Sequence, residues 1–590
     1  MYYGQRMFGV PCPLPKGANI LGMLWAYSVK TDGRKKARMV CNGRPSNKNT
    51  AIFGYTFAKS LDHVGSRIFW AVAAARNYVV RGADASNAFA EAEAPKIPLF
   101  VRLNEPYRQW WTERMNQPSI PKDFVLPVNK ALQGHPEAPR AWAMLIHKIL
   151  TTKLKLKSTT HEPCLYYGQF NGQDILFLRQ ADDFAVAAPT ESIATQVIEE
   201  IDKYMSIKIK DLGLLQRYNG VDIKQTKHYI TIHNPTYIDK IVQEHQWMLD
   251  DCHLNTFPLP VHNEKKLMRQ FEEASLPQTE DEQRELQLRM RFNYRQAIGE
   301  LVFAMVTCRP DIAFPLIKLS QYSANPAEVH YKAVVSIFQY LHATREQGIT
   351  FWRTTPNPNL PDEKLPTVHK SNYEPTDTSE VDSPTTLHGA VDSDWADDTQ
   401  HRKSVTGIIL RLAGGTIYYK TKFQDTIAQS TTEAEFSAAC DAGKAILYIR
   451  SILEEIQVPQ EKATTLYIGN NGALLMGNAQ KPTRRTRHMD IKKFVLQDWI
   501  QRDLILLKRI NTADNYADGM TKQTGRQLFH RHFDYILGNI QPKYVETQTI
   551  EKDKILHNDT GKQEITPAIH MVCDLHLATC STEHGGDIIP

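Results

Sequence analysis

An Asp-Asp pair between two apolar runs is the first feature of this sequence that suggests chemistry. Asp182 and Asp183 lie between Ile175–Gln180 and Phe184–Ala188, whose length and composition predict the two strands of a tight β-hairpin. The apex would then carry two carboxylates, and burying two like charges is costly unless a cation neutralises them. Oxygen ligands suit Mg²⁺ or Mn²⁺. The chain has further Asp-Asp pairs, so the pattern alone leaves a solvent-exposed turn as the alternative.

A third carboxylate would complete such a metal site. Asp84 follows the apolar run Val79–Ala83, which is a candidate strand. Phosphoryl transfer from a nucleoside triphosphate needs two cations roughly 3.5–4 Å apart, one for the attacking hydroxyl and one for the leaving pyrophosphate. Three carboxylates from separate segments, here Asp84, Asp182 and Asp183, would be enough to hold two such ions.

The elements that must position these residues are of mixed α/β type. Asn87–Glu93 is compatible with a helix, and two amphipathic helices are expected at Asp311–Tyr322 and Pro326–His342. Farther along the chain, three strands, a long helix, a strand, a helix and a strand follow in RNase H-like order. Their expected ranges are Leu387–Asp392, Gly407–Ala413, Thr416–Lys422, Thr432–Ile456, Thr465–Ile468, Ile491–Arg502 and Leu504–Ile510.

Composition excludes several classes of protein. The 590 residues are 42% hydrophobic and 23% charged, which excludes wholesale disorder. The net charge of +5 is too small to indicate a nucleic-acid partner by itself. Neither a long apolar span nor a signal pattern occurs, so we expect no membrane segment and no secretion. The eight scattered cysteines are typical of reduced thiols in an intracellular protein.

Proline and polar residues mark the expected boundaries. Residues 353–386 are rich in proline, acidic residues, serine and threonine, which predicts a flexible linker or insertion. A softer boundary lies at about 250–285, where prolines and a charged run interrupt the pattern. After Gly538 the sequence turns polar and loses periodicity, so we expect a poorly ordered tail.

Short motifs follow one another in a fixed order from about residue 20 to residue 538. The first half contains Lys36-Ala37-Arg38-Met39-Val40, Asp84-Ala85-Ser86-Asn87-Ala88-Phe89, Leu132-Gln133-Gly134-His135-Pro136-Glu137-Ala138-Pro139-Arg140-Ala141-Trp142 and Gln180-Ala181-Asp182-Asp183. The second half contains Arg309-Pro310-Asp311-Ile312, Asp392-Ser393-Asp394-Trp395-Ala396, Ser430-Thr431-Thr432-Glu433-Ala434-Glu435-Phe436 and Ala517-Asp518-Gly519-Met520-Thr521-Lys522. Together they resemble the reverse transcriptase and RNase H region of copia-type retrotransposon Pol polyproteins.

This resemblance implies a right-hand polymerase followed by an RNase H-like domain, a multidomain protein of α/β and α+β class. The implied domains are fingers and palm (20–250), thumb or connection helices (251–352), the linker (353–386), the RNase H-like domain (387–538) and a disordered tail (539–590). The implied function is RNA-directed DNA polymerase, which extends a primer 3′-hydroxyl with dNTPs on an RNA or DNA template.

Residue roles are carried over from the resemblance position by position. Asp84, Asp182 and Asp183 become the catalytic palm metal ligands, and Phe89 becomes the steric gate against a ribose 2′-hydroxyl. The remaining substrate contacts are Lys36 and Arg38 at the triphosphate, and Gln133 and Arg140 at the nucleotide and template side. The alternatives are an ordinary core aromatic for Phe89 and a solvated basic face for Lys36 and Arg38. At the hairpin, Gln180 and Ala181 replace the family's usual Tyr and Val.

The RNase H motifs are less complete. Asp392, Glu435 and Asp518 match three of the four carboxylates that this family uses to hold two cations. The remaining position is Gly469, which has no oxygen to offer, and Asn470 is displaced by one residue to the other side of a strand. We therefore expect RNase H activity to be absent or much reduced, and a Gly469→Asp variant to exceed the native chain.

Two further groups carry weaker signals. Positive charge gathers before and within an expected helix, where phosphate contact is the functional interpretation and a solvated helix the alternative. The residues expected to bind nucleic acid are Arg484, Arg485, Arg487, His488 and Lys492. The tail contains Cys573, His576, Cys580 and His584, whose spacing fits no tetrahedral zinc pattern, so a disordered tail is favoured.

Two other functions stay open besides the polymerase. A degenerate, catalytically inactive retroelement fragment that only binds nucleic acid is supported by Gly469 and by the lack of a protease or integrase segment upstream. A stand-alone nuclease is disfavoured, because the nuclease carboxylates are the damaged set. The implied partners are an RNA template, a DNA primer, RNA/DNA hybrid, dNTPs, and other retroelement proteins such as integrase and capsid. The implied location is a cytoplasmic particle or the nucleus.

Overall fold

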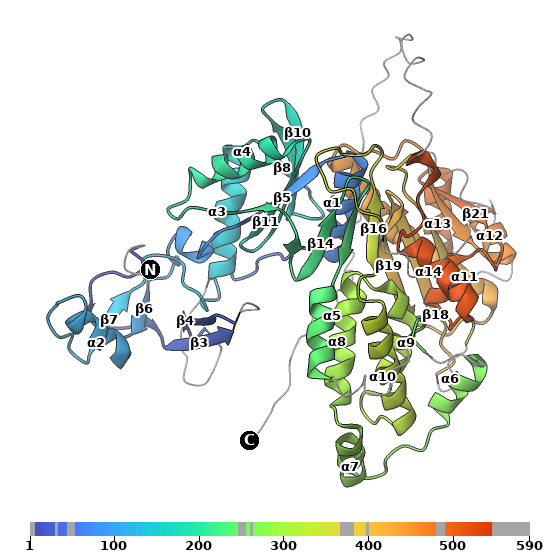
Figure 1. Cartoon of the computed structure of the whole chain (residues 1–590), viewed down its shortest axis with the longest axis horizontal. Coiled ribbons are helices and arrows are strands. Elements are labelled where there is room, and N and C mark those ends of the chain that lie inside the picture. The colour runs from blue at the N-terminus through green and yellow to red at the C-terminus, as the bar shows by residue number, and fades with distance from the viewer. Residues whose placement is uncertain are drawn as a thin grey trace. The chain divides into compact units, whose positions relative to one another are not determined.

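The computed structural model describes residues 6–29, 33–43, 54–245, 255–259, 264–365, 383–396, 401–479 and 490–545. Residues Met1–Glu546 form one compact unit, and every element discussed below belongs to it (Figure 1). The predicted domain boundaries therefore stay predictions. Most of the predicted tail lies outside the described residues.

Two small sheets are built from the N-terminal part. A four-stranded sheet has the order β1-β7-β6-β2, and the separate hairpin β3–β4 carries the Lys36-to-Val40 motif. The strands are β1 (Cys12–Pro13), β2 (Asn19–Leu21), β3 (Met23–Val29), β4 (Lys35–Cys41), β6 (Leu99–Arg102) and β7 (Phe124–Pro127), with helix α2 (Glu105–Glu113) between the last two.

A six-stranded sheet of order β12-β5-β11-β10-β9-β8 carries the Asp-Asp hairpin. Its strands are β5 (Val79–Asp84), β8 (Lys157–Ser158), β9 (Leu165–Phe170), β10 (Gln173–Gln180), β11 (Asp183–Ala188) and β12 (Lys210–Leu214). Phe177 and Phe184 pack against helices α3 (Ala138–Thr152) and α4 (Glu191–Asp202), whereas Leu176 and Leu178 pack against α1 (His63–Ala75). Because both faces are covered, the central strands are continuously apolar rather than alternating.

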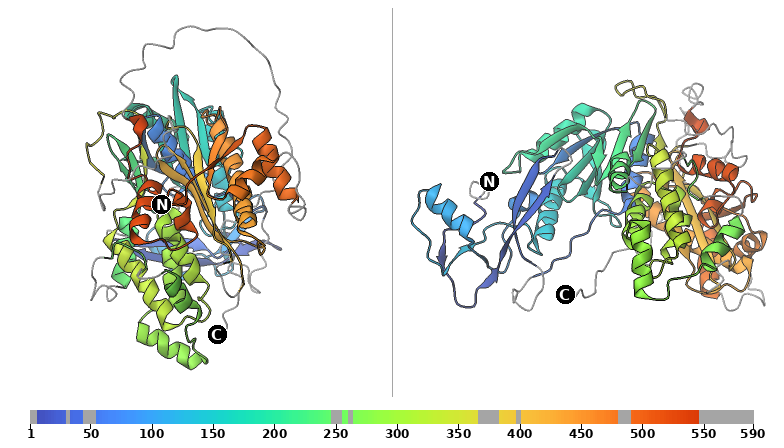
Figure 2. Two further views of the ribbon diagram at one scale, coloured as in Figure 1. Left: turned by 90° about the vertical axis from the view of Figure 1, so that its right-hand side faces the viewer. Right: turned by 60° about the horizontal axis from the view of Figure 1, so that its bottom comes forward.

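A third sheet and a helical bundle follow. The sheet has the order β13-β14-β15-β16, with strands β13 (Arg217–Tyr218), β14 (Val221–Gln225), β15 (Tyr229–His233) and β16 (Gly348–Trp352). The helices between them are green to yellow-green in Figure 2, and α5, α8, α9 and α10 pack together there as a bundle. They are α5 (Pro235–Glu244), α6 (Glu264–Glu272), α7 (Glu280–Met290), α8 (Tyr294–Thr307), α9 (Ala313–Ser320) and α10 (Glu328–Ala343).

The C-terminal sheet has the order β19-β18-β17-β20-β21. The first three strands are antiparallel neighbours, whereas β20 and β21 run parallel to β17, which is the order expected of an RNase H-like unit. The elements are β17 (His388–Ser393), β18 (Val405–Leu412), β19 (Gly415–Phe423), α11 (Thr431–Glu455), β20 (Thr464–Ile468), α12 (Asn471–Asn478), α13 (Asp490–Gln501), β21 (Ile505–Arg509) and α14 (Arg526–Ile536).

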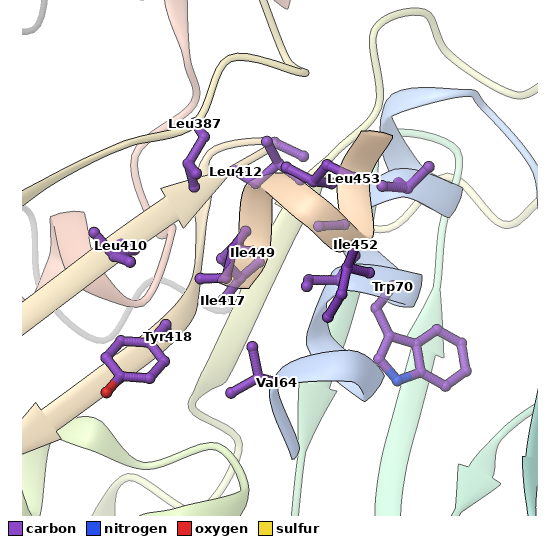
Figure 3. Packing of buried hydrophobic residues seen from close by; sticks show 14 of the residues in the cluster. Val64, Trp70, Leu387, Leu410, Leu412, Ile417, Tyr418, Ile449, Ile452 and Leu453 are labelled. Atoms are coloured by element: carbon purple, nitrogen blue, oxygen red, sulfur yellow. The ribbon is translucent and has the colours of Figure 1, made fainter. Parts of the chain in front are cut away.

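Helix α1 joins the two halves of the chain through a shared apolar core. Figure 3 shows Val64 and Trp70 of α1 near Ile417, Tyr418 and Ile452 of the C-terminal half, all in one buried cluster. Nearly every residue of α1 is buried, including Arg67, because the helix is covered by packing partners on all sides. The six-stranded sheet that carries the Asp-Asp hairpin and the C-terminal sheet are therefore packed against the same helix.

The predicted fold class is confirmed, and most expected elements are present. Three details differ. Asp311–Tyr322 begins as a short 3-10 turn (Pro310–Ile312) before α9, and Asn87–Glu93 contains only the 3-10 helix Ala88–Glu91. Helix α12 was not expected.

The start of the predicted linker is anchored. The backbone N–H of Asn357 donates to the carbonyl of Lys227 (2.8 Å), and the N–H of Lys227 donates to the carbonyl of Pro361 (2.8 Å). Arg353 is buried and donates to the carbonyl of Tyr78. These hydrogen bonds hold a segment that composition alone assigned to a flexible linker. Residues 366–382 lie outside the described residues.

Candidate active sites

Asp84 and Asp183 lie directly opposite each other on β5 and β11. Opposed residues of an antiparallel pair have Cα atoms about 4.5–5.5 Å apart and point to the same face. The N–H of Ala85 also donates to the carbonyl of Asp182 (2.9 Å). The strand end at residue 84 and the hairpin apex are therefore in direct contact, as the sequence predicted.

Proximity of like charges changes the acidity of this site. Burial, and then the negative charges of Asp182 and Asp84, raise the pKa of Asp183 to about 6. An ionised carboxylate that is destabilised by neighbouring negative charges is stabilised when a cation approaches. The electrostatics of the apex therefore favour a divalent ion.

The donor set fits Mg²⁺ or Mn²⁺, although the described residues contain no group of three or more acidic, histidine or cysteine side chains that is already gathered around one point. Carboxylates on opposed strand ends can turn toward an ion when it binds, and hard divalent ions prefer such oxygens. Asp84, Asp182 and Asp183 would be the residues that hold it.

Phe89 lies in the 3-10 helix that follows β5, five residues after Asp84. Its ring is half-buried and packs against apolar residues of α3 and its neighbours. Its packing fits the core-aromatic interpretation, and its closeness to Asp84 in sequence fits the steric gate, so this role stays a prediction.

The other predicted substrate residues lie on elements joined to the same core. Lys36 and Arg38 are two residues apart on β4 and therefore share a face of that strand. The end of β4 meets Gln133, whose carbonyl accepts from the N–H of Cys41 (2.8 Å). Arg140 on α3 donates to the carbonyl of Phe57 (3.3 Å), so its guanidinium already has a partner.

The three carboxylates predicted for the RNase H site lie near one another in the C-terminal half, although they are not already gathered around one point. Asp392 comes from β17, Glu435 from the start of α11 and Asp518 from the 3-10 helix Tyr516–Met520. All three are buried. Burial, followed by the charge of Asp392, raises the pKa of both Glu435 and Asp518. Mutual repulsion of this kind requires that the three groups lie close together.

Free acceptor atoms remain in this cluster. Oε2 of Glu435 and Oδ1 of Asp518 have no hydrogen-bond partner among the described residues, whereas Asp392 accepts from Asn515 (3.2 Å) and from the hydroxyl of Thr521. Unsatisfied buried carboxylate oxygens suit a cation. These carboxylate oxygens are therefore compatible with a metal ion. Position 469 contributes no oxygen to them, because it is a glycine.

Gly469 directly follows strand β20, at the position where a fourth carboxylate was expected. A Cβ built there would meet Nδ2 of Asn515 at 3.6 Å, which is an ordinary contact, and the same Asn515 holds Asp392. Asn470 instead caps helix α12, because its side chain accepts from the N–H of Ala473 (3.0 Å). Gly469 therefore faces the cluster, and Asn470 is engaged elsewhere.

Sequence reasoning assigned no role to Lys522 and Trp142. Nζ of Lys522 lies 2.8 Å from Oδ2 of Asp518 and supplies positive charge to the cluster. Nε1 of Trp142 donates to the carbonyl of Ala181 at the hairpin apex (2.7 Å). Each is the last residue of one of the short family motifs, Leu132–Trp142 and Ala517–Lys522. That position was the one indication in the sequence that these two residues have a role.

The predicted basic patch lies mostly outside the residues that the structure describes. Arg484, Arg485, Arg487 and His488 lie outside the described residues, and Lys492 falls within α13 without a described side chain. Their role in binding nucleic acid stays a prediction. The Cys/His-containing tail is also outside the described ranges. The five described cysteines, Cys12, Cys41, Cys164, Cys308 and Cys440, are free thiols.

Comparison with known proteins bears on the first half most directly. Residues 10–261 match the family described as reverse transcriptase (RNA-dependent DNA polymerase). A Pol polyprotein from transposon TNT 1-94 of Nicotiana tabacum is 26% identical over 524 residues, which are 88% of this chain and 35% of that protein. The resemblance to a copia-type retrotransposon Pol polyprotein is confirmed. The Pol polyprotein from transposon RE2 of Arabidopsis thaliana is 24% identical over 91% of this chain and 33% of its own length. This Pol-like chain thus spans about a third of the curated relatives it matches.

Solved structures of low identity were also found. A foamy viral protease-reverse transcriptase in complex with double-stranded DNA is 13% identical, with a TM-score of 0.43, over 87% of this chain and 68% of that chain. The same viral protein in complex with RNA/DNA hybrid has a TM-score of 0.36, over 85% and 51%. Within the described ranges of the Pol-like chain, no helix combines the length and the apolar character that crossing a membrane requires.

Proposed function

We propose that this chain is an RNA-directed DNA polymerase that extends a primer 3′-hydroxyl with dNTPs by two-metal phosphoryl transfer. The observation that carries the proposal is the opposed pair Asp84 and Asp183, with Asp182 joined to the same strand end. The match of residues 10–261 to the reverse transcriptase family supports it.

The chain's own residues would divide the work at this site. Asp84, Asp182 and Asp183 would hold two Mg²⁺ or Mn²⁺ ions, which when bound supply activation of the primer 3′-hydroxyl and neutralisation of the leaving pyrophosphate. Phe89, five residues beyond Asp84, would exclude a ribose 2′-hydroxyl. Lys36 on β4 would stabilise triphosphate charge.

Three further residues complete the proposed substrate contacts. Arg38, which shares a face of β4 with Lys36, would also bind the triphosphate. Gln133 and Arg140 would line the nucleotide and template side. Because Arg140 is already bound to the carbonyl of Phe57, it would act there as part of a fixed wall.

We propose that the RNase H-like half has lost or reduced activity. Asp392, Glu435 and Asp518 supply three carboxylates, and Gly469 supplies no fourth. Two cations at an RNase H site need ligands on both sides of the cut phosphate. A site that lacks the carboxylate ligand at position 469 would bind an RNA/DNA hybrid and cut its RNA strand slowly.

The proposed partners follow from this function. They are an RNA template, a DNA primer, RNA/DNA hybrid and dNTPs, together with other retroelement proteins such as integrase and capsid. The basic residues Arg484, Arg485, Arg487, His488 and Lys492 are proposed to contact phosphates. A cytoplasmic particle or the nucleus remains the proposed location.

Primer extension on poly(rA) with an oligo(dT) primer tests the polymerase proposal. The native chain should incorporate dTTP in a Mg²⁺-dependent manner, and Asp183→Ala should reduce incorporation to background. Asp174→Asn is the matched control, since it removes a carboxylate from the other end of the same hairpin. Incorporation that survives Asp183→Ala would refute the assigned site.

A second function is favoured by one observation. Gly469 leaves the RNase H-like carboxylates incomplete, which is compatible with a degenerate element that binds nucleic acid without catalysis. Equal background incorporation by the native chain and Asp183→Ala, together with salt-dependent hybrid binding, would support this alternative.

A further inference from the structure

The apex of the Asp-Asp hairpin has a conformation that needs support. Ala181 has a φ of 51°, in the left-handed region that an alanine occupies at a cost, because its Cβ approaches the following carbonyl. Gln180 and Asp183 are the last paired residues before this turn. The orientation of Asp182 and Asp183 therefore depends on a turn that is not at its own energy minimum.

One buried side chain, that of Trp142, forms a hydrogen bond with the backbone of this turn. Nε1 of Trp142 donates to the carbonyl of Ala181 (2.7 Å), and only 1% of the Trp142 residue is exposed. Its ring stacks on Phe184 with the centroids 6.3 Å apart and the planes at 16°. Trp142 thus contacts Ala181, the residue before the Asp-Asp pair, and Phe184, the residue after it. Its contact with the turn itself is a single hydrogen bond.

The position of Trp142 is itself fixed. It lies on α3, which packs against the same sheet, and its neighbours Ile146 and Ile149 on that helix are buried in the same cluster. A rigid indole can therefore define where the carbonyl of Ala181 lies. Gln180 gives a second tie, because its side-chain carbonyl accepts from the N–H of Leu61 (2.8 Å).

We propose that Trp142 is a positioning residue of the polymerase site, which holds the apex so that Asp182 and Asp183 face Asp84. The inference rests on the proposed function for its catalytic meaning, although the tether itself is a property of the fold. Trp142 touches neither substrate nor ion in this proposal. Its effect is transmitted through the backbone of Ala181.

The test separates the N–H group from the ring. Trp142→Phe keeps an aromatic ring against Phe184 and removes the donor. A lost hydrogen bond of this kind changes an equilibrium by up to about tenfold. We expect kcat to fall about tenfold and the Mg²⁺ concentration for half-maximal extension to rise severalfold, with KM for the primer–template unchanged.

A matched control removes the same kind of hydrogen bond far from the hairpin. Nε1 of buried Trp352 donates to the carbonyl of Gly538 (2.8 Å), so Trp352→Phe carries a similar loss of stability. It should leave the Mg²⁺ dependence at the native value. A shift of equal size in both variants would show that Trp142 is merely structural and would overturn the proposal.

A second measurement does not depend on activity. The N–H of Ala85 donates to the carbonyl of Asp182, so its hydrogen exchange reports the position of the apex. Exchange at Ala85 should be faster in Trp142→Phe than in the native chain and in Trp352→Phe. Native rates of exchange in Trp142→Phe would overturn the tether.

Two further outcomes remain decisive. If Trp142→Phe does not fold, 3-benzothienylalanine at position 142 keeps the bicyclic ring without the N–H, and the same exchange comparison applies. If the native chain fails to extend any primer, the proposed function is refuted, while exchange at Ala85 still decides whether Trp142 holds the apex.

Discussion

Asp84 and Asp183 are direct cross-strand partners, at the point where β5 ends and β11 begins. The next pair along these strands, Ala83 with Phe184, is buried and apolar, and so is the pair Val80 with Ala187. The two carboxylates therefore lie where the buried part of the sheet ends. The packing of the apolar residues behind them fixes the register of β5 against β11, which places the two carboxylates opposite each other.

The first prediction concerns Asp183→Asn. Because the folded-state pKa of Asp183 is raised to about 6, ionisation destabilises the folded protein at pH values above 6, and the cost disappears as the pH falls toward 4. Asp183→Asn should therefore stabilise the metal-free chain at pH 7.5 by about 1–2 kcal/mol, after allowance for solvent screening. It should also abolish primer extension.

Urea unfolding in EDTA, followed by tryptophan fluorescence, checks this prediction at pH 4.5 and pH 7.5. The gain in stability should shrink at the lower pH and when Mg²⁺ is added. Asp174→Asn serves as the control and should show neither effect. A variant that is less stable than the native chain at pH 7.5 would contradict the repulsion among the three carboxylates.

The second prediction concerns Gly469→Asp. The open space beside Asn515 admits the new side chain, which would supply the missing fourth carboxylate near Asp392. Cleavage of the RNA strand in a labelled hybrid should rise at least about tenfold, as for other changes in metal-site ligation. Without Mg²⁺ the variant should be less stable, because another negative charge joins a buried cluster.

Asn470→Asp provides the comparison for that experiment. It adds a carboxylate one residue away, and Asp caps a helix as well as Asn does, so α12 should be preserved. Its cleavage rate should stay at the native level. Equal cleavage by the native chain, Gly469→Asp and Asn470→Asp would show that Gly469 is not the vacant ligand position.

The third prediction concerns a buried ion pair in the helical bundle. Arg309 and Asp311 have no exposed side-chain surface and lie 2.7 Å apart, and the hydroxyl of Tyr340 also donates to Asp311 (2.6 Å). Asp311→Ala would leave a buried guanidinium uncompensated and should cost about 3–5 kcal/mol of stability. Tyr340→Phe removes one hydrogen bond and should cost about 1–2 kcal/mol. Similar, small losses for both in urea unfolding would contradict this ranking.

The fourth prediction concerns the contact between the two halves. Arg67 on α1 is buried and donates to the carbonyl of Thr307 (3.1 Å) and to the hydroxyl of Tyr419 on β19 (2.8 Å). Arg67→Leu leaves these groups without a donor and should cost about 3 kcal/mol. Exposed Arg345, which pairs with Asp239 (3.0 Å), is the control, and Arg345→Ala should cost less than about 1 kcal/mol.

Thermal and urea unfolding of these two arginine variants give the comparison. Fluorescence and far-UV circular dichroism should follow a single transition in the native chain. A loss for Arg67→Leu no larger than that for Arg345→Ala would contradict the importance of this contact.

Local pattern was sufficient to predict the hairpin around Asp182 and the order of the C-terminal strands. The apolar runs have strand length, and their turn residues are clear, so each element could be recognised from its own residues. Helix α12 was not predicted because it is short and contains Gly472 and Gly477, which weaken the helical signal.

Non-local contacts were not predictable from the sequence alone. The pairing of β15 with β16 joins Tyr229 to Trp352, and no local pattern encodes such a distant partner. The bond from Trp142 to Ala181 likewise depends on how α3 packs against the sheet. For Gly469 the sequence predicted a vacant ligand position, and only the fold shows that a side chain would fit there.

Helix α1 has a consequence for any attempt to divide this protein. A fragment that ends before residue 387 would lose the partners of Val64 and the Tyr419 hydroxyl that binds Arg67, and it would present bare aliphatic surface to water. Such a fragment should aggregate. Polymerase and RNase H assays are therefore best separated by point substitutions in the intact chain.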